Sequence, residues 1–169
     1  MKLIADAVFR SFDQIDPEQL SRAGIRLVIS DLDNTLEDYK AWTPRPEVVA
    51  WRDALAERGI TLFIATNNRK QRGLHYCEAL GSPYIWRAGK PDPRSLNEAM
   101  VRCGATREQT LMLGDQVFTD VRAAGNAGVR AALVRPIDLS NPLRLLRYGL
   151  EQPFVRRARK SNGDGGWKR

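Results

Sequence analysis

The chain has 169 residues, a net charge of +7 and only two cysteines. This length predicts one domain, which can bury roughly two-thirds of its unfolded surface without disulfide bonds. We place that domain at residues 1–155 and expect a basic, mobile tail at 156–169. Cys77 and Cys103 fit no disulfide framework or metal-binding spacing, which is typical of a reduced, cytoplasmic protein. A signal peptide and a membrane span are not expected, because no apolar run is long enough.

The positive charge gathers at the carboxyl-terminal end. Residues 130–169 hold ten Lys or Arg and three acids, so their net charge of +7 equals that of the whole chain. The cations within Arg156–Lys160 suit the inner face of an anionic membrane or the phosphates of RNA, or they only keep the protein soluble. The sequence leaves these alternatives open, with nucleic acid the less favoured partner. It does not indicate the oligomeric state.

The chain alternates helical and strand patterns. Apolar residues between positions 3 and 15 recur at roughly helical spacing, so we expect a leading helix that packs on the core, and a second short helix follows at 16–24. Leu27–Ile29 is typical of a buried strand. Further helices are expected at 46–58, 71–80, 93–103 and in a segment ending at Gly128, and further strands at 60–65, 84–86, 110–113 and 131–134. Thr106, with Gln109 three residues later, resembles a capping box, which predicts a turn of helix before the strand at 110–113. This alternation predicts an α/β fold whose five-stranded parallel sheet is covered by helices on both faces.

Two acids follow the first strand directly. Strand periodicity places Asp31 and Asp33 on the same side of the chain, where two carboxylates need either a cation between them or separated pKa values. An isolated pair of this kind more often caps a helix or faces solvent. The assignment therefore depends on the rest of the chain.

Three other polar clusters also fall just beyond strand ends. Thr66, Lys90 and Asp115 follow later strands, and ligands of parallel α/β sheets bind beyond the carboxyl ends of the strands. Carboxylates without a His or Cys partner favour Mg²⁺, and His75 lies within an expected helix. With no phosphate-binding glycine-rich motif present, Asp31 becomes the candidate nucleophile for phosphoryl transfer.

Together, these residues resemble the four motifs of the haloacid dehalogenase (HAD) superfamily of phosphatases. The resemblance is strongest to subclass IIIA and its YqeG-type family, which is similar to phosphatidylglycerophosphate phosphatases. It implies a Rossmann-like, three-layer α/β/α fold. The motifs are Asp31-Leu32-Asp33-Asn34-Thr35-Leu36, Thr66-Asn67-Asn68, Lys90-Pro91, and Gly114-Asp115-Gln116 with Thr119-Asp120.

The resemblance implies a role for each catalytic residue. Asp31 attacks phosphorus, and Asp33 protonates the leaving group and then activates water. Thr66 binds the phosphoryl oxygens, and Lys90 stabilises their charge.

It also implies a metal site and a substrate side. Mg²⁺ is held by Asp31, Asp115 and the main-chain carbonyl of Asp33, with Asp120 nearby as a second acid. Asn67 and Gln116 line the substrate side, together with Thr66 and Lys90.

The spacing of the motifs leaves no room for a cap domain. Only 35 positions separate Asp31 from Thr66, and 24 separate Thr66 from Lys90. An open site admits a phosphate on a large molecule, so a lipid head group is favoured, with phosphatidylglycerophosphate implied by the resemblance. The alternatives are a soluble nucleotide or sugar phosphate, or RNA binding with incidental phosphatase activity. Beyond the fifth strand we expect a helix whose leucines, Leu143, Leu146 and Leu150, pack on the sheet rather than contact a membrane.

Overall fold

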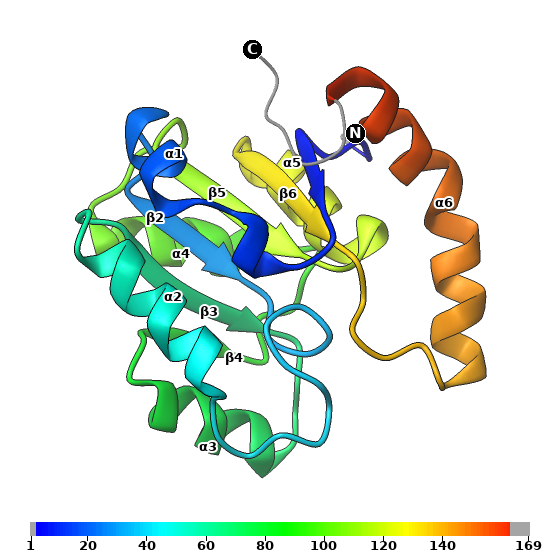
Figure 1. Ribbon diagram of the computed structural model, residues 1–169, viewed down its shortest axis with the longest axis horizontal. Coiled ribbons are helices and arrows are strands. Elements are labelled where there is room, and N and C mark those ends of the chain that lie inside the picture. Colours follow the sequence, from blue (N-terminus) through cyan, green and yellow to red (C-terminus); the bar gives the residue numbers. More distant parts are fainter. Residues whose placement is uncertain (1–2, 163–169) are drawn as a thin grey trace.

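A six-stranded parallel sheet organises the chain, whose residues 3–162 are described by a computed structural model (Figure 1). The strand order is β1-β6-β5-β2-β3-β4. The strands are β1 (Ala7–Phe9), β2 (Leu27–Ser30), β3 (Thr61–Thr66), β4 (Tyr84–Trp86), β5 (Thr110–Gly114) and β6 (Arg130–Val134). The predicted α/β fold is therefore confirmed, with six strands in place of five.

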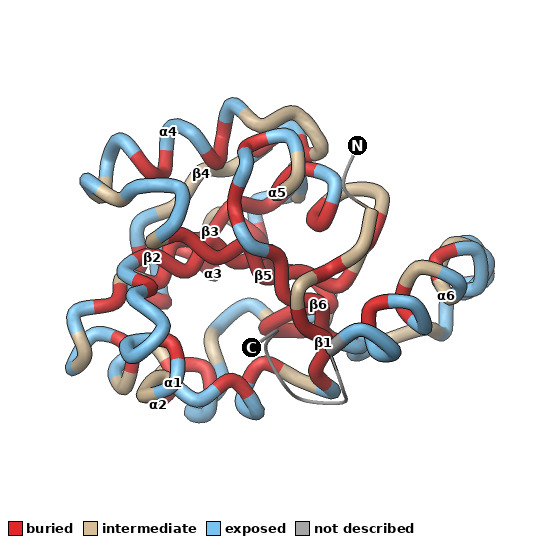
Figure 2. Tube along the Cα trace, turned by 90° about the horizontal axis from the view of Figure 1, so that it is seen from above, coloured by how far each residue is buried: buried red, intermediate tan, exposed pale blue. Residues whose placement is uncertain are grey.

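Helices cover both faces of the sheet, so the fold has three layers. They are α1 (Pro17–Arg22), α2 (Pro46–Ala56), α3 (Gln71–Leu80), α4 (Arg94–Cys103), α5 (Arg122–Ala127) and α6 (Pro142–Asn162). One hydrophobic core lies between the sheet and α1, α2 and α3, and the other lies between the sheet and α4, α5 and the last turns of α6. Figure 2 shows the sheet between α1 and α2 on one side and α4 and α5 on the other.

The central strands are buried on both faces. In β2, Val28 contributes to the first core, whereas Leu27 and Ile29 contribute to the second. Such a strand appears in the sequence as a continuous apolar run rather than an alternating pattern. Its carboxyl end therefore projects Asp31 from the middle of the sheet.

The leading helix predicted for residues 3–15 is wrong. Ala7–Phe9 forms strand β1, which pairs in parallel with β6, and Phe12–Gln14 forms a 3₁₀ turn. All three residues of β1 are buried, so the strand has no alternation to distinguish it from an apolar helix. Pairing with a strand more than 120 residues away decided the structure of this segment.

One smaller expectation, a turn of helix, is corrected, and another, the lack of room for a cap domain, is confirmed. The turn of helix predicted at Thr106 is a non-helical turn, in which the Gln109 side chain accepts a hydrogen bond from the Thr106 N–H at 3.1 Å. One helix, α2, connects β2 with β3, and one helix, α3, connects β3 with β4. Within residues 3–162, no cap domain is inserted over the carboxyl edge of the sheet.

Helix α6 lies beside the β1 edge and does not bury the leucines that were expected to pack on the sheet (Figure 1). Its buried face carries Glu151, Val155 and Ala158 instead, and Glu151 accepts a hydrogen bond from the Phe118 N–H at 3.0 Å. A buried glutamate was not expected, so the leucines were assigned to the wrong face. They are exposed: Leu143 by 77%, Leu145 by 54%, Leu146 by 62% and Leu150 by 61%.

The expected boundary between residues 155 and 156 falls inside this helix. Residues 156–162 continue α6, and the rest of the predicted mobile tail, including Trp167, lies outside the described residues. A search of residues 3–162 finds no helix with the length and apolarity needed to cross a bilayer.

Candidate active site

The first two acids extend from strand β2. The Asp31 N–H donates to the Leu113 carbonyl at 2.9 Å, which prolongs the pairing of β2 with β5 by one residue. Asp31 and Asp33 are 7% and 6% exposed, so both side chains are largely buried. Burial strengthens every charge interaction that they make.

Two further acids follow strand β5. Asp115 comes directly after the strand, and Asp120 lies in a π-helical turn over Val117–Val121 that brings its carboxylate back to the strand end. The Gln116 N–H donates to Asp120 Oδ2 at 3.1 Å. Gly114 is required here, because a Cβ atom at this position would overlap the Asp120 carboxyl group. The glycine of the fourth motif therefore makes room for the last acid of the same motif.

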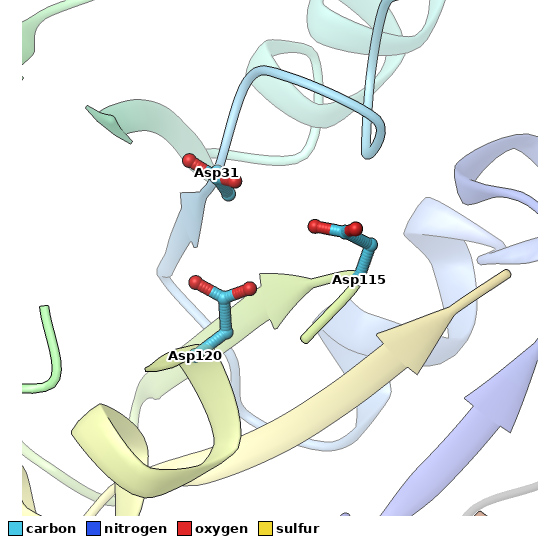
Figure 3. A group of neighbouring side chains, drawn as sticks. All are labelled: Asp31, Asp115 and Asp120. Atoms are coloured by element: carbon cyan, nitrogen blue, oxygen red, sulfur yellow. The ribbon is translucent and has the colours of Figure 1, made fainter. Parts of the chain in front are cut away.

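Asp31, Asp115 and Asp120 converge on one point (Figure 3). One carboxylate oxygen from each lies within 4.8 Å of the others, and Asp115 Oδ2 is buried without a hydrogen-bond partner. Three oxygen donors with an unsatisfied buried oxygen among them fit a hard cation such as Mg²⁺. Asp33, which was predicted to contribute its main-chain carbonyl, is not among these three side chains.

Lys90 supplies one positive charge to the cluster. Its Nζ lies 2.9 Å from Asp31 Oδ1 and 2.8 Å from Asp120 Oδ1. Burial lowers the pKa of Lys90, but the carboxylates of Asp120 and Asp31 outweigh burial and hold the pKa above its usual value. The lysine is therefore a fixed cation between two acids.

A single ammonium does not balance three carboxylates. Burial raises the pKa of Asp31 to about 7, although Lys90 lowers it. Burial, followed by the charges of Asp120 and Asp31, raises the pKa of Asp115 well above its ordinary value. A divalent cation would restore the balance and keep these groups ionised at neutral pH.

Asp33 has two partners that the sequence analysis missed. Arg72 forms an ion pair with Asp33 Oδ1, and the Asn68 side-chain amide donates to Asp33 Oδ2 at 2.6 Å. Burial raises the pKa of Asp33, and Arg72 limits the increase. Gly73 allows this arrangement, because a Cβ there would lie 2.9 Å from the Asn68 side chain. An arginine next to a glycine in the first turn of the helix after Asn68 was the available signal.

The remaining predicted residues lie around the same edge. Thr66 ends β3, and its hydroxyl accepts a hydrogen bond from the Asn68 N–H at 3.0 Å. The Asn67 amide accepts from the Lys90 N–H and donates to the Lys90 carbonyl, both at 2.9 Å. The Gln116 side chain accepts from the Thr119 hydroxyl at 3.0 Å. The fold therefore gathers all eight predicted site residues at the carboxyl edge of the sheet, and Asn67 holds the backbone of Lys90.

An open cavity of about 540 Å³ leads to Asp31. Helix α6 contributes Arg144 and Arg147 to its wall, which the sequence analysis did not assign to the site. No motif signals these two arginines, because only the path of α6 brings them to the cavity. The wall consists of Asp31, Asp33, Tyr39, Thr66, Asn67, Asn68, Arg69, Lys70, Gln116, Thr119, Arg144 and Arg147.

A buried carboxylate beside a fixed lysine and two further acids, at the carboxyl edge of a parallel sheet, suits phosphoryl transfer to a carboxylate. The profile of the haloacid dehalogenase-like hydrolases matches residues 2–128 of the chain. The chain belongs to this family, and it is a phosphatase. Members of the family generally use Mg²⁺.

Relatives with known names agree with this assignment. The chain is 31% identical over 138 residues to the probable phosphatase YqeG of Bacillus subtilis, covering 82% of this chain and 80% of the relative. It is 30% identical over 95 residues to a phosphoglycolate phosphatase of Agrobacterium fabrum, covering 51% and 40% of the two chains. The fold resembles the cobalt-bound deoxy-D-mannose-octulosonate 8-phosphate phosphatase of Haemophilus influenzae, with a TM-score of 0.56, 16% identity and coverage of 82% and 93%.

Proposed function

We propose that the protein is a magnesium-dependent phosphomonoesterase that acts through an aspartyl-phosphate on Asp31, and that its substrate is phosphatidylglycerophosphate. The chemical part rests on the group formed by Asp31, Lys90, Asp115 and Asp120. The lipid part rests on helix α6, which exposes leucines to solvent.

In the first step, an oxygen of Asp31 attacks phosphorus. A P–O bond to the carboxylate forms, the ester P–O bond breaks, and the alcohol leaves with a proton from Asp33. The raised pKa of Asp33, caused by burial and limited by Arg72, keeps its protonated form accessible. Arg72 and Asn68 orient the Asp33 carboxyl group for this transfer.

In the second step, Asp33 takes a proton from a water molecule. The resulting oxygen attacks phosphorus, the bond to Asp31 breaks, and inorganic phosphate is released. Lys90 remains beside Asp31 throughout, where its ammonium offsets negative charge on the transferring group. The hydroxyl of Thr66 and the amides of Asn67 and Gln116 bind the substrate around this point.

The metal site of the proposal consists of Asp31, Asp115 and Asp120, with the main-chain carbonyl of Asp33. Mg²⁺ supplies neutralisation of the phosphoryl oxygens when it is bound. Gly114 and Lys90 keep the Asp120 carboxylate in place for it.

The exposed leucines are the single observation that carries the lipid substrate. Leu143, Leu146 and Leu150 follow the i, i+3, i+7 spacing of one helix face, and the more distal Arg156–Lys160 segment is basic. A helix with apolar side chains next to cations binds at an anionic bilayer surface. We therefore propose a cytoplasmic protein that binds peripherally to the inner face of the membrane.

Phosphate release from a panel of esters tests this proposal. The panel holds phosphatidylglycerophosphate in mixed micelles, mononucleotides, sugar phosphates and an aryl phosphate, each with Mg²⁺ or with EDTA. We expect magnesium-dependent release that is strongest on the lipid. Release confined to a soluble ester would keep the mechanism and reject the lipid. Absence of release across the panel would reject the function and favour RNA binding by the basic helix.

A further inference from the structure

Two arginines of α6 are more than the scissile phosphate requires. Lys90, together with a cation held by the three carboxylates, would already balance the charge of that phosphate. Yet the wall of the cavity carries four additional cationic side chains, Arg69, Lys70, Arg144 and Arg147. An anion other than the scissile phosphate would account for them.

Arg144 is held in position at the cavity wall. Its guanidinium lies 3.6 Å from the centre of the Tyr39 ring, and its Nη1 lies 3.0 Å from Asp138 Oδ2. Asp138 is itself fixed to the first motif, because its N–H donates to Asn34 Oδ1 at 3.0 Å and its carbonyl accepts from Asn34 Nδ2 at 2.9 Å. The loop of the nucleophile and the start of α6 therefore form one unit.

Arg147 lies one helical turn further on the same face of α6. Its Nε is buried and has no hydrogen-bond partner, and no acid of residues 3–162 lies within ion-pair distance of its guanidinium. Its positive charge reaches Asp115 and Glu151, where it opposes the rise in pKa that burial causes. Arg147 is half-buried on the cavity wall, and a guanidinium placed there with an unused Nε donor suits an anionic ligand.

Helix α6 presents both arginines rigidly. Glu151, one turn beyond Arg147, is 2% exposed and accepts the Phe118 N–H at 3.0 Å, which ties α6 to the π-helical turn that carries Asp120. Guanidinium groups bind phosphate oxygens through paired N–H donors. The subsite is therefore attached to both sides of the catalytic centre.

We propose that Arg144 and Arg147 bind a second anionic group of the substrate, distinct from the phosphoryl group that Asp31 attacks. This inference rests on the proposed function and narrows the class of substrate. The substrate class is a phosphomonoester with a second phosphate group nearby, either the phosphodiester of a lipid head group or the second phosphate of a soluble bisphosphate.

Equilibrium binding tests the subsite independently of turnover. The Asp31→Asn protein is titrated by calorimetry in the presence of Mg²⁺. The first pair of ligands is glycerol 3-phosphate and the deacylated head group of phosphatidylglycerophosphate, which carries a phosphodiester in addition to the same monoester. A second pair, fructose 6-phosphate and fructose 1,6-bisphosphate, represents soluble substrates. We expect the second anion to strengthen binding about ten- to hundredfold in at least one pair. The pair that shows the larger gain identifies the source of the anion.

Arg147→Gln in the same background should remove most of that gain, and Arg147→Lys should restore part of it. Arg130→Gln, which removes the same charge at the opposite edge of the sheet, is the matched control. Equal weakening of both members of each pair by Arg147→Gln would show a general electrostatic role and overturn the subsite. The subsite would also be overturned if the Asp31→Asn protein, with both arginines intact, bound the two members of each pair with equal affinity. In both cases, phosphate release by the wild-type protein would leave the proposed function standing.

Discussion

The carboxyl edge of the sheet and helix α6 differ in how their cationic side chains are paired and in how far their apolar side chains are exposed. At the sheet edge, Lys90 and Arg72 are paired with buried acids, and the surrounding apolar side chains are enclosed. On α6, Arg147 lies within ion-pair distance of no acid among residues 3–162, and four leucines face solvent. The sheet edge carries groups that suit a cation and a phosphate, whereas α6 presents a cation and an apolar face that have no partner of this kind among residues 3–162. We therefore propose that the chemistry resides in the first region and the choice of substrate in the second.

The largest effect on turnover is expected when the nucleophile is removed. Asp31→Asn keeps the shape of the side chain but cannot form the acyl phosphate, so turnover should fall on the order of 10⁴-fold or more. Phosphate release under saturating Mg²⁺ measures it. Asp53→Asn, at an exposed position of α2, is the control. Substantial residual turnover would mean that another group attacks phosphorus.

Gly114→Ala should displace the Asp120 carboxylate, because the added Cβ overlaps it. Asp120 is buried and paired with Lys90, so it cannot move aside cheaply. We expect Mg²⁺ affinity to fall about 10- to 100-fold, measured as the Mg²⁺ concentration that gives half-maximal activity. Gly149→Ala, where a Cβ would meet nothing within 4 Å, should leave that concentration unchanged.

The acidic cluster should also make stability depend on pH. Because burial raises the pKa of Asp31 to about 7 and that of Asp115 well above 3.8, the folded state binds more protons than the unfolded state above about pH 4. Without divalent cations, Tm should therefore fall as pH rises from 5 to 8. Mg²⁺ in large excess over its Kd should reverse this fall by about 3 kcal/mol of unfolding free energy. A Tm that rises with pH in EDTA would contradict the assigned burial of the cluster.

The smallest effect on the folded protein is expected on the outer face of α6. Combined Leu143→Ser, Leu146→Ser and Leu150→Ser should change the free energy of unfolding by about 0.5 kcal/mol or less per site, because these side chains are exposed. Binding to anionic vesicles should fall by about tenfold or more, since apolar insertion is lost. Val101→Ser, at a residue of α4 that is 82% exposed, is the control. Unchanged vesicle binding would separate these leucines from the membrane.

The grouping of the candidate site residues could be predicted because their signals are local. Asp31 and Asp33 follow an apolar run, and Thr66, Lys90 and Asp115 each follow a strand end, so parallel topology alone brings them together. Helix α3 and strand β4 were predicted with the bounds that they have, since the helix ends at a glycine with a positive φ.

The incorrect predictions concern segments whose structure is determined by tertiary contacts. Strand β1 pairs with β6 over a distance in sequence that no local pattern covers. Helix α6 buries Glu151, which accepts a hydrogen bond from the Phe118 N–H, together with Val155 and Ala158, and none of these contacts is visible in the leucine pattern. Arg72, Arg144 and Arg147 resemble ordinary surface arginines in the sequence, and only the path of their helices places them at the site.

Phosphate release from phosphatidylglycerophosphate in anionic vesicles is the most direct test of the account. Release should require Mg²⁺, disappear in Asp31→Asn, and proceed with a kcat/KM at least about tenfold above that of any soluble ester without a second phosphate. A kcat/KM for the lipid no higher than that for sugar phosphates or mononucleotides would contradict the proposed lipid substrate.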